Sequence, residues 1–180
     1  MKSRIVVGTS KTGKSLFATR LAYEDGMRYM NQLKEIGESY LFPEEETVID
    51  TCNDIDYEHL LTIIEGIDSF KNKYNKYKLY VIFSPLWTSY HRYLSSINPN
   101  IEKQLNALEF ETRYKRLYNE DLLTRLNDRK AVFVLSIDNK WCFLPFDRFM
   151  MVVKDCYESQ ERGMNTIESV IFEIENKISR

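Results

Sequence analysis

The sequence predicts an α/β fold with a mainly parallel central sheet. Short apolar runs rich in β-branched residues alternate along the chain with longer stretches whose apolar residues recur three and four positions apart. The first pattern is typical of buried strands and the second of helices. Strands that alternate with helices usually pair in parallel. A glycine-rich stretch lies between the first strand and the first helix, and such sheets bind ligands at the carboxyl ends of their strands.

The first half of the chain is expected to supply two strands and two helices. The first helix contains apolar residues at helical spacing and is expected to end near Gly37, because glycine favours the left-handed conformation of a helix C-cap. A polar connection follows the second helix over residues 71–78 (KNKYNKYK). The predicted ranges are 4–7 and 47–50 for the strands, and 14 to about 36 and 57–70 for the helices.

The second half continues the alternation. Leu79-Tyr80-Val81-Ile82-Phe83 is the clearest strand of the chain and is closed by Ser84-Pro85. The longest helical pattern is a single one, over residues 101 to about 128. The expected strands cover residues 79–83, 131–135 and 149–153, and the expected helices cover residues 88–95, 101–128 and 166–178.

Residues 8–15 read GTSKTGKS and match the phosphate-binding P-loop pattern G-x-x-x-x-G-K-[ST] at every fixed position. The predicted strand before them and the predicted helix after them are the context that the motif needs. A helix N-terminus offers unpaired N–H groups and partial positive charge to phosphate oxygens. Gly8 and Gly13 allow the close approach that a Cβ would block. The predicted nucleotide contacts are Gly8, Thr9, Ser10, Lys11, Thr12, Gly13, Lys14, Ser15 and Leu16.

The end of this motif predicts that the chain uses ATP and Mg²⁺. The Lys14 ammonium would reach the β- and γ-phosphates, and the Ser15 hydroxyl would complete a magnesium shell made otherwise of water and phosphate oxygens. Replacing Lys14 by alanine is therefore expected to abolish most of the nucleotide-dependent activity, while the chain still folds normally because alanine suits a helix.

A second acid is expected to assist the metal or to take a proton from the acceptor. Asp50 is the best candidate, because it ends an apolar strand at the edge of the sheet where ligands bind. Asp54 and Asp56 lie just beyond it, and Asp138 follows the strand that begins at Ala131. The competing interpretation of Asp50 is a cap of a turn or helix.

Cations are also needed where negative charge develops during phosphoryl transfer. Arg92 follows the strand at residues 79–83, and Arg113 and Arg116 are three residues apart on the long predicted helix, so that they share a face. These three arginines are the candidates, and each could instead be an ordinary surface residue. Arg125 and Arg129 are further options.

Composition indicates one soluble domain. The 180 residues carry a net charge of −2, which gives no general attraction to nucleic acid or to an anionic membrane. The three cysteines are widely separated, which indicates reduced thiols and a cytoplasmic location. No apolar run approaches the length of a membrane span. We expect a single domain over residues 1–180, with a candidate lid at about 86–128.

Beyond the P-loop, the second half resembles the nucleoside and nucleotide kinases, the thymidylate and deoxynucleoside kinases in particular. The resemblance rests on LYVIFSP (79–85), on LWTSYHRYL with Arg92, on the helical pattern LEFETRYKRLYNEDLL (108–123) and on VFVLSID, which ends in Asp138. It also includes the final pattern NTIESVIFEIENKI (165–178). The resemblance implies transfer of the γ-phosphoryl group of ATP to a small acceptor. VIDTCND (48–54) stands where those kinases carry an Asp-Arg pair.

A second resemblance is to the RecA-like ATPases. Lys11-Thr12-Gly13-Lys14-Ser15 fits their K-x-G-K-[ST] loops, and TVIDT (47–51) resembles their Walker B strand. Ser84 would then be the polar sensor, and the strands around Val132 and Val152 an antiparallel edge. This resemblance implies an ATPase that acts with nucleic acid or a protein partner. A GTPase interpretation rests on NKWC (139–142), where the guanine motif needs aspartate in place of Cys142.

Overall fold

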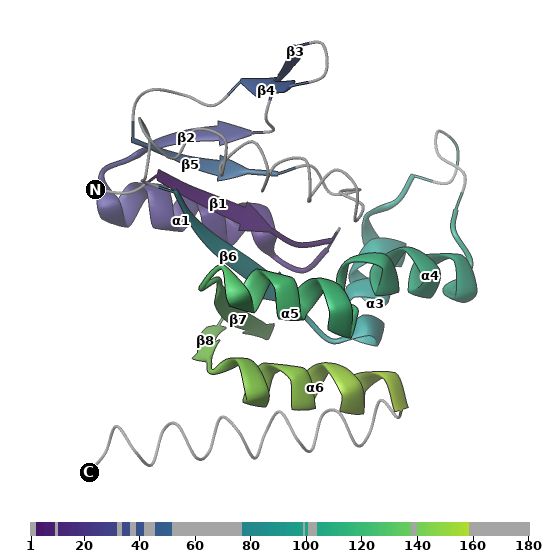
Figure 1. Cartoon of the computed structure of the whole chain (residues 1–180). Helices are drawn as coiled ribbons and strands as arrows, with labels where there is room; N and C mark the ends of the chain where they lie inside the picture. Colours follow the sequence, from purple (N-terminus) through teal and green to yellow (C-terminus); the bar gives the residue numbers. More distant parts are fainter. Residues whose placement is uncertain are drawn as a thin grey trace.

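The computed structural model describes residues 3–9, 11–31, 34–36, 39–41, 46–51, 77–98, 100, 104–137 and 140–158. Six of the described strands form one sheet in the order β2-β5-β1-β6-β7-β8 (Figure 1). These strands are β1 (Ser3–Val7), β2 (Arg28–Asn31), β5 (Thr47–Asp50), β6 (Tyr77–Phe83), β7 (Val132–Ile137) and β8 (Lys140–Leu144). The helices are α1 (Lys14–Asp25), α3 (Leu86–Ser96), α4 (Ala107–Leu117), α5 (Glu120–Asp128) and α6 (Phe146–Glu158).

The strand before the glycine-rich loop lies inside the sheet, as the sequence predicts. β1 pairs in parallel with β5 on one side and with β6 on the other, so that Ile5 lies beside both Ile49 and Leu79. β2–β5 and β6–β7 are parallel pairs too, and β7–β8 is antiparallel. The α/β class with a mainly parallel sheet is therefore confirmed.

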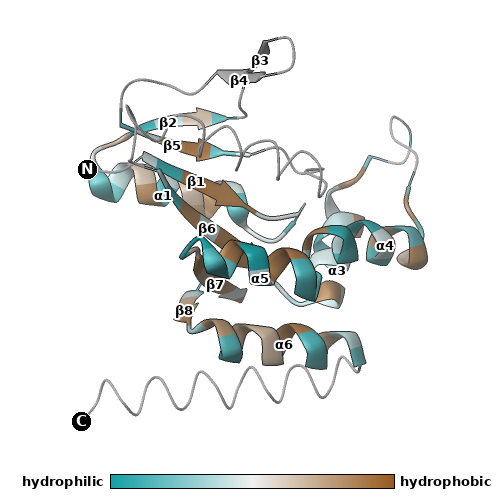
Figure 2. Cartoon of the chain, in the orientation of Figure 1, coloured by the Kyte–Doolittle hydropathy of each residue, from teal (hydrophilic) through white to brown (hydrophobic). Residues whose placement is uncertain are grey.

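Helices cover both faces of this sheet, which gives three layers. On one face, Phe17 and Ala18 of α1 pack in a cluster that contains Val6 of β1 and Ile82 of β6. On the opposite face, apolar side chains of α4, α5 and α6 pack against the alternate strand residues, among them Ile5. Figure 2 shows the central strands brown, and brown alternating with teal along α5 and α6. The alternation of side chains along each strand supplies both cores.

The first helix is shorter than the sequence predicts. α1 ends at Asp25, and Gly26 caps it in the left-handed conformation with φ 63°. The prediction of a helix to about residue 36 with a cap at Gly37 is wrong, because Arg28–Asn31 pairs with β5 as the edge strand β2. Residues 34–36 and 39–41 form β3 (Lys34–Ile36) and β4 (Ser39–Leu41), a separate antiparallel pair. The edge of the sheet thus outweighs the local helical pattern.

The prediction of one long helix over residues 101–128 is also wrong, because the described part of this stretch contains two helices. α4 begins at a capping box in which Asn106 and Glu109 bond to each other's backbone N–H groups. It ends at Leu117, and α5 starts after Asn119, whose side chain accepts a hydrogen bond from Leu122 N. Helical spacing continues across the break, which is why the periodicity alone does not reveal it.

The end of the described chain holds a further difference. The strand predicted at residues 149–153 is wrong, because these residues lie inside α6. The antiparallel neighbour of β7 is instead β8, which the sequence does not predict as a strand. Short apolar runs such as FMMVV fit either type of element, and the burial of Phe149, Val152, Val153 and Cys156 follows helical spacing. The antiparallel edge is real, but β8 rather than residues 149–153 forms it with β7.

The other predicted elements have simple outcomes. The strands at 47–50, 79–83 and 131–135 are confirmed as β5, β6 and β7, with β6 beginning two residues earlier, at Tyr77. The helix predicted at 88–95 is α3. The helices predicted at 57–70 and 166–178 lie outside the described residues. None of the helices in the described ranges is long and apolar enough to cross a bilayer.

Candidate functional site

The glycine-rich loop runs from the end of β1 to the first turn of α1, at the carboxyl edge of the sheet. Lys11 and Gly13 both have positive φ angles, 66° and 81°, and these turn the backbone back toward the helix. The helix begins with a hydrogen bond from Phe17 N to Gly13 O of 3.0 Å. The first N–H groups of an α-helix have no partner within the helix, and such groups bind anions in other proteins.

Lys14 and Asp50 form a buried ion pair. Lys14 is the first residue of α1 and 3% exposed, while Asp50 ends β5 and is 0% exposed. The Lys14 ammonium donates to Asp50 Oδ1 and to the carbonyl oxygen of Thr51. Thr51 is itself fixed to β1, because its N–H and hydroxyl both donate to Val6 O. The predicted phosphate-binding cation and the predicted second acid therefore lie in direct contact.

The other carboxylate oxygen of Asp50 accepts a hydrogen bond from Tyr29. The phenol of Tyr29, on β2, donates to Asp50 Oδ2 at 2.8 Å. Partial burial raises the pKa of Tyr29, and the hydrogen bond to Asp50 and the negative charge of that carboxylate raise it further. The phenol therefore stays protonated at neutral pH and acts as a donor. Asp50 is held by Lys14 on one side and by Tyr29 on the other.

The loop is held by a hydrogen bond within it and by contacts with the core. Thr12 donates its hydroxyl hydrogen to Thr9 O at 2.8 Å, which closes the loop on itself. The N–H of Thr9 donates to the hydroxyl of Tyr118 at 3.1 Å. A Cβ added to Gly8 would lie 3.0 Å from Ile82 O and 3.0 Å from the Thr12 hydroxyl. Gly8 is thus required by close approach, since a side chain there would push the loop off β6.

Arg92 approaches the loop from α3. Its Nη1 donates to Lys11 O and to Ser84 Oγ, both at 3.3 Å. Ser84 directly follows β6 and donates its own hydroxyl hydrogen to Ser136 O of β7 at 2.8 Å. Arg92 is the one of the three predicted arginines that contacts the P-loop within the described structure. That its guanidinium neutralises negative charge on a bound phosphate stays a prediction.

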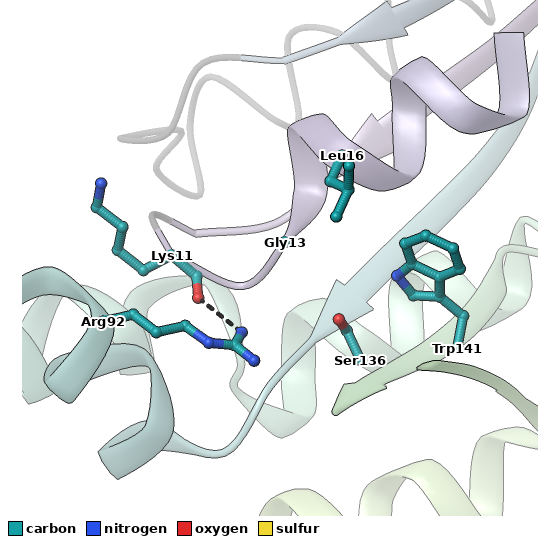
Figure 3. Close-up of a pocket in the computed structure, with 6 residues that line it drawn as sticks. All are labelled: Lys11, Gly13, Leu16, Arg92, Ser136 and Trp141. Carbon is teal, nitrogen blue, oxygen red and sulfur yellow. Dashed lines mark hydrogen bonds between the residues drawn. The ribbon is translucent and has the colours of Figure 1, made fainter. Parts of the chain in front are cut away.

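A cavity of about 260 Å³ opens beside the loop, lined by Lys11, Gly13, Leu16, Arg92, Ser136 and Trp141. Figure 3 shows the Leu16 side chain and the Ser136 hydroxyl directed toward this space, with the indole nitrogen of Trp141 turned to the same side. Trp141 Nε1 is buried and has no hydrogen-bond partner among the described residues. The Arg20 guanidinium lies 5.0 Å from the centre of the indole ring. The cavity is therefore lined by the cationic side chain of Arg92 and by the aromatic ring of Trp141.

The structure brings together only some of the predicted site residues. Lys14, Asp50 and Arg92 lie around the P-loop, whereas Arg113 and Arg116 are exposed on α4 and do not line the cavity. Ser10, Asp54, Asp56 and Asp138 lie outside the described residues, as does Asn139 of the NKWC motif. Arg125 and Arg129 lie at the end of α5 and do not line the cavity either. The roles of Arg113 and Arg116 stay predictions.

The residues present fit a magnesium ion. Ser15 is exposed in the first turn of α1, so its hydroxyl is accessible next to the loop, and Asp50 supplies a carboxylate at the end of β5. Hydroxyl and carboxylate oxygens are the donors that Mg²⁺ prefers, with phosphate and water oxygens filling its remaining positions. Because Lys14 and Tyr29 occupy both oxygens of Asp50, we expect Asp50 to act on the metal through water.

Several site residues could not be found from the sequence. The sequence predicts Tyr29 within the first helix, where it would not approach Asp50. Ser136 and Trp141 come from β7 and β8, and β8 was not expected as a strand. Tyr118 lies at a break in a helix that the periodicity presents as continuous. A signal did exist for Asn119, because asparagine is a preferred N-cap residue and marks a helix start.

Similarity to known proteins is found among solved structures. No family model and no curated protein matches this sequence. The crystal structure of a gluconokinase from Sinorhizobium meliloti 1021 aligns with it at a TM-score of 0.47 and 11% sequence identity. The alignment covers 96% of this chain and 97% of that one. A likeness this low carries no argument about activity, so the function has to be argued from the site itself.

Proposed function

We propose that this protein is an ATP- and Mg²⁺-dependent phosphotransferase that moves the γ-phosphoryl group of ATP to a small acceptor. The observation that carries the proposal is the arrangement around one cavity. A P-loop at a helix N-terminus, with Lys14 and the Arg92 guanidinium beside it, borders an open cavity that Trp141 lines on another side. Phosphate groups bind such loops through backbone N–H groups, and two cations close to the loop suit the charge that develops in phosphoryl transfer.

Each residue then has a role that its surroundings support. Phosphate oxygens in the loop compete with Asp50 for the Lys14 ammonium, which moves from the ion pair to the β- and γ-phosphates. Asp50, still held by Tyr29, is left near the metal or the acceptor hydroxyl. Magnesium, held by Ser15 and by water on Asp50, would supply charge neutralisation between phosphates. Arg92 neutralises the transferring group from the opposite side of the loop.

The aromatic side of the cavity suits a nucleotide base. Trp141 and Leu16 offer an apolar surface to the base. Stacking of a base on an aromatic side chain is worth about 1–3 kcal/mol. We therefore propose that the base lies between Leu16 and Trp141, while the phosphates lie on the loop.

The acceptor is proposed to be a nucleoside or a nucleotide, which rests on the sequence resemblance to those kinases. The segment at 86–128 contains α3, α4 and α5, and much of its apolar surface belongs to the core. Arg113 and Arg116 lie on the exposed side of α4, so they would meet an acceptor only if this segment moves over the site. A cytoplasmic location fits the three widely separated cysteines of the sequence, Cys52, Cys142 and Cys156.

The test combines binding with a panel of acceptors. The chain has two tryptophans, so Trp87→Phe leaves Trp141 as the reporter. Titration of this variant with Mg-ATP is expected to quench Trp141 fluorescence, whereas Trp141→Phe, which keeps Trp87, shows little change. Radiolabelled ATP with nucleosides and nucleotides should yield a labelled acceptor. A variant that keeps its fold but neither quenches nor binds ATP would contradict the proposal.

The same assay decides the alternative of a RecA-like ATPase that acts with nucleic acid or a protein partner. One observation favours it: Ser84 at the end of β6 bonds to Arg92 next to the loop, as a polar sensor would. In that case phosphate release without a labelled acceptor is expected, with a rate that rises when single- or double-stranded DNA is added. A turnover that ignores DNA and labels an acceptor excludes it.

A further inference from the structure

Tyr118 links the P-loop to the break between α4 and α5. Its hydroxyl accepts the hydrogen bond from Thr9 N at 3.1 Å and donates to Ile82 O of β6. The side chain is fully buried, with its ring 5.1 Å from that of Phe83 in an edge-on arrangement. An added Cβ on Gly8 would lie 3.4 Å from the same hydroxyl. The Tyr118 hydroxyl therefore lies next to the first two residues of the loop, Gly8 and Thr9.

The contact continues into the part of the loop that would meet phosphate. Thr9 is fixed by Tyr118 through its N–H, and its carbonyl oxygen accepts from the Thr12 hydroxyl at 2.8 Å. Thr12 is completely buried and precedes Gly13 and Lys14. Two hydrogen bonds in series thus run from the helix break to the residues on either side of the anion-binding turn.

The helix break is held from its other side as well. The Tyr118 carbonyl oxygen accepts a hydrogen bond from Tyr157 of α6 at 2.6 Å. The last turn of α4 and the end of α6 therefore fix the position of Tyr118, whose hydroxyl is bonded to the loop. A loop that must present several N–H groups to a phosphate gains affinity when its geometry is set before binding.

We propose that Tyr118 is a positioning residue of the nucleotide site, which it serves by holding Thr9, and through Thr12 the phosphate-binding turn, in the conformation that binds. The inference rests on the proposed nucleotide-binding function. It adds a residue that lies outside the motif and 109 positions away from Thr9 in the chain.

A neighbouring tyrosine gives a matched control. Tyr114 lies one helical turn before Tyr118, is equally buried, and donates its hydroxyl hydrogen to Ser84 O at the end of β6. No hydrogen bond to the loop is described for it. Both Tyr114→Phe and Tyr118→Phe remove a buried hydrogen bond to the end of the same strand, but only Tyr118→Phe releases the P-loop.

The experiment measures Mg-ATP affinity by isothermal titration calorimetry, and urea unfolding, for the full chain and both variants. We expect both substitutions to lower stability by similar amounts. Tyr118→Phe should weaken ATP binding by about three- to tenfold, and Tyr114→Phe should leave it unchanged. Equal affinities of Tyr118→Phe and the wild type would overturn the inference, and so would equal losses in the two variants.

Thr12→Val provides a second variant, which leaves the phenol of Tyr118 in place. It removes the hydroxyl donor while it keeps the shape of the side chain, so it should weaken ATP binding as Tyr118→Phe does. The double variant should lose less than the product of the two single losses, because both break one series of contacts. Independent, multiplying losses would overturn the inference. Failure of the wild type to bind ATP would overturn the proposed function itself, and this inference with it.

Discussion

The Lys14 ammonium and the Asp50 carboxylate form an ion pair between the start of α1 and the end of β5, with 3% and 0% of their side chains exposed. Two charges withdrawn from water to this degree are stable only together, because either charge alone would lose its hydration without compensation. The same ammonium is the cation that we propose to bind phosphate. The pair therefore links the stability of the fold to the chemistry of the site.

This pair changes the expected effect of replacing Lys14. From the sequence alone, Lys14→Ala is expected to fold normally, whereas removal of one partner of a buried pair costs about 3–5 kcal/mol. We expect Lys14→Met and Asp50→Asn each to lower the free energy of unfolding, and the double variant to lose less than the sum. Urea unfolding of all four proteins measures the coupling, which should exceed about 1 kcal/mol. Strict additivity would show that the pair does not form in solution.

Gly13 and Gly26 offer a comparison between a loop glycine and a helix cap. Both have positive φ, 81° and 63°, so alanine at either position should cost about 1–2 kcal/mol of stability. A Cβ on Gly13 would also lie 3.0 Å from Ser136 Oγ at the cavity, whereas nothing lies within 4 Å of one on Gly26. We expect Gly13→Ala alone to weaken ATP binding, as measured by calorimetry. A comparable loss of binding in Gly26→Ala would contradict this.

Arg92 is expected to matter more for turnover than for folding. Its guanidinium contacts Lys11 O and Ser84 Oγ at 3.3 Å, at the edge of the cavity. Removing such a cation should lower kcat by about a hundredfold, because its contribution is largest when charge develops. Arg113→Ala and Arg116→Ala should reduce kcat less, since both side chains are exposed on α4. Lys154→Ala, on the exposed side of α6, serves as the control, and an equal loss there would refute the assignment.

Alkaline pH should unfold the protein through its buried tyrosines. Burial raises the pKa of Tyr118 from 10.0 to about 12, and burial raises the pKa values of Tyr114 and Tyr157 as well. Between pH 10 and about pH 12, Tyr118 keeps its proton in the folded chain and loses it in the unfolded chain. The free energy of unfolding therefore falls as the pH rises through this range. Each such group contributes a slope of about 1.4 kcal/mol per pH unit.

Urea unfolding at several pH values from 8 upward, with phenolate absorbance as a second signal, measures this slope. Below the pKa of an unfolded tyrosine the stability should be flat with respect to these groups. Tyr118→Phe should remove about one proton from the slope above it. A slope that is unchanged in this variant would mean that Tyr118 ionises equally easily in the folded protein.

The separation of α4 from α5 can be tested at Asn119. Its side chain accepts from Leu122 N at 2.9 Å and donates to Arg116 O at 2.8 Å, so it satisfies groups on both sides of the break. Asn119→Ala should lose about 1 kcal/mol, while Asn119→Asp keeps the capping acceptor and should lose less. Thermal unfolding followed by circular dichroism distinguishes the two variants. An alanine variant of unchanged stability would indicate a continuous helix.

The sequence by itself determined the elements whose signals are local. The fixed positions of GTSKTGKS predict the loop, and the strands at β1, β5, β6 and β7 are short apolar runs that are recognisable one at a time. The placement of Asp50 at the sheet edge followed from its position directly after an apolar strand. Such features depend on neighbouring residues along the chain, so composition and spacing suffice for them.

The tertiary structure decided what depends on distant residues. Arg28–Asn31 became a strand because β5 offered an open edge, and the apolar run at Phe149 became a helix because one of its faces packs on the sheet. The contacts of Asp50 with Tyr29, and of Thr9 with Tyr118, join segments 21 and 109 residues apart. The spacing of apolar residues along the chain cannot predict such contacts, because they form and contribute energy only when the sheet and its helices have come together.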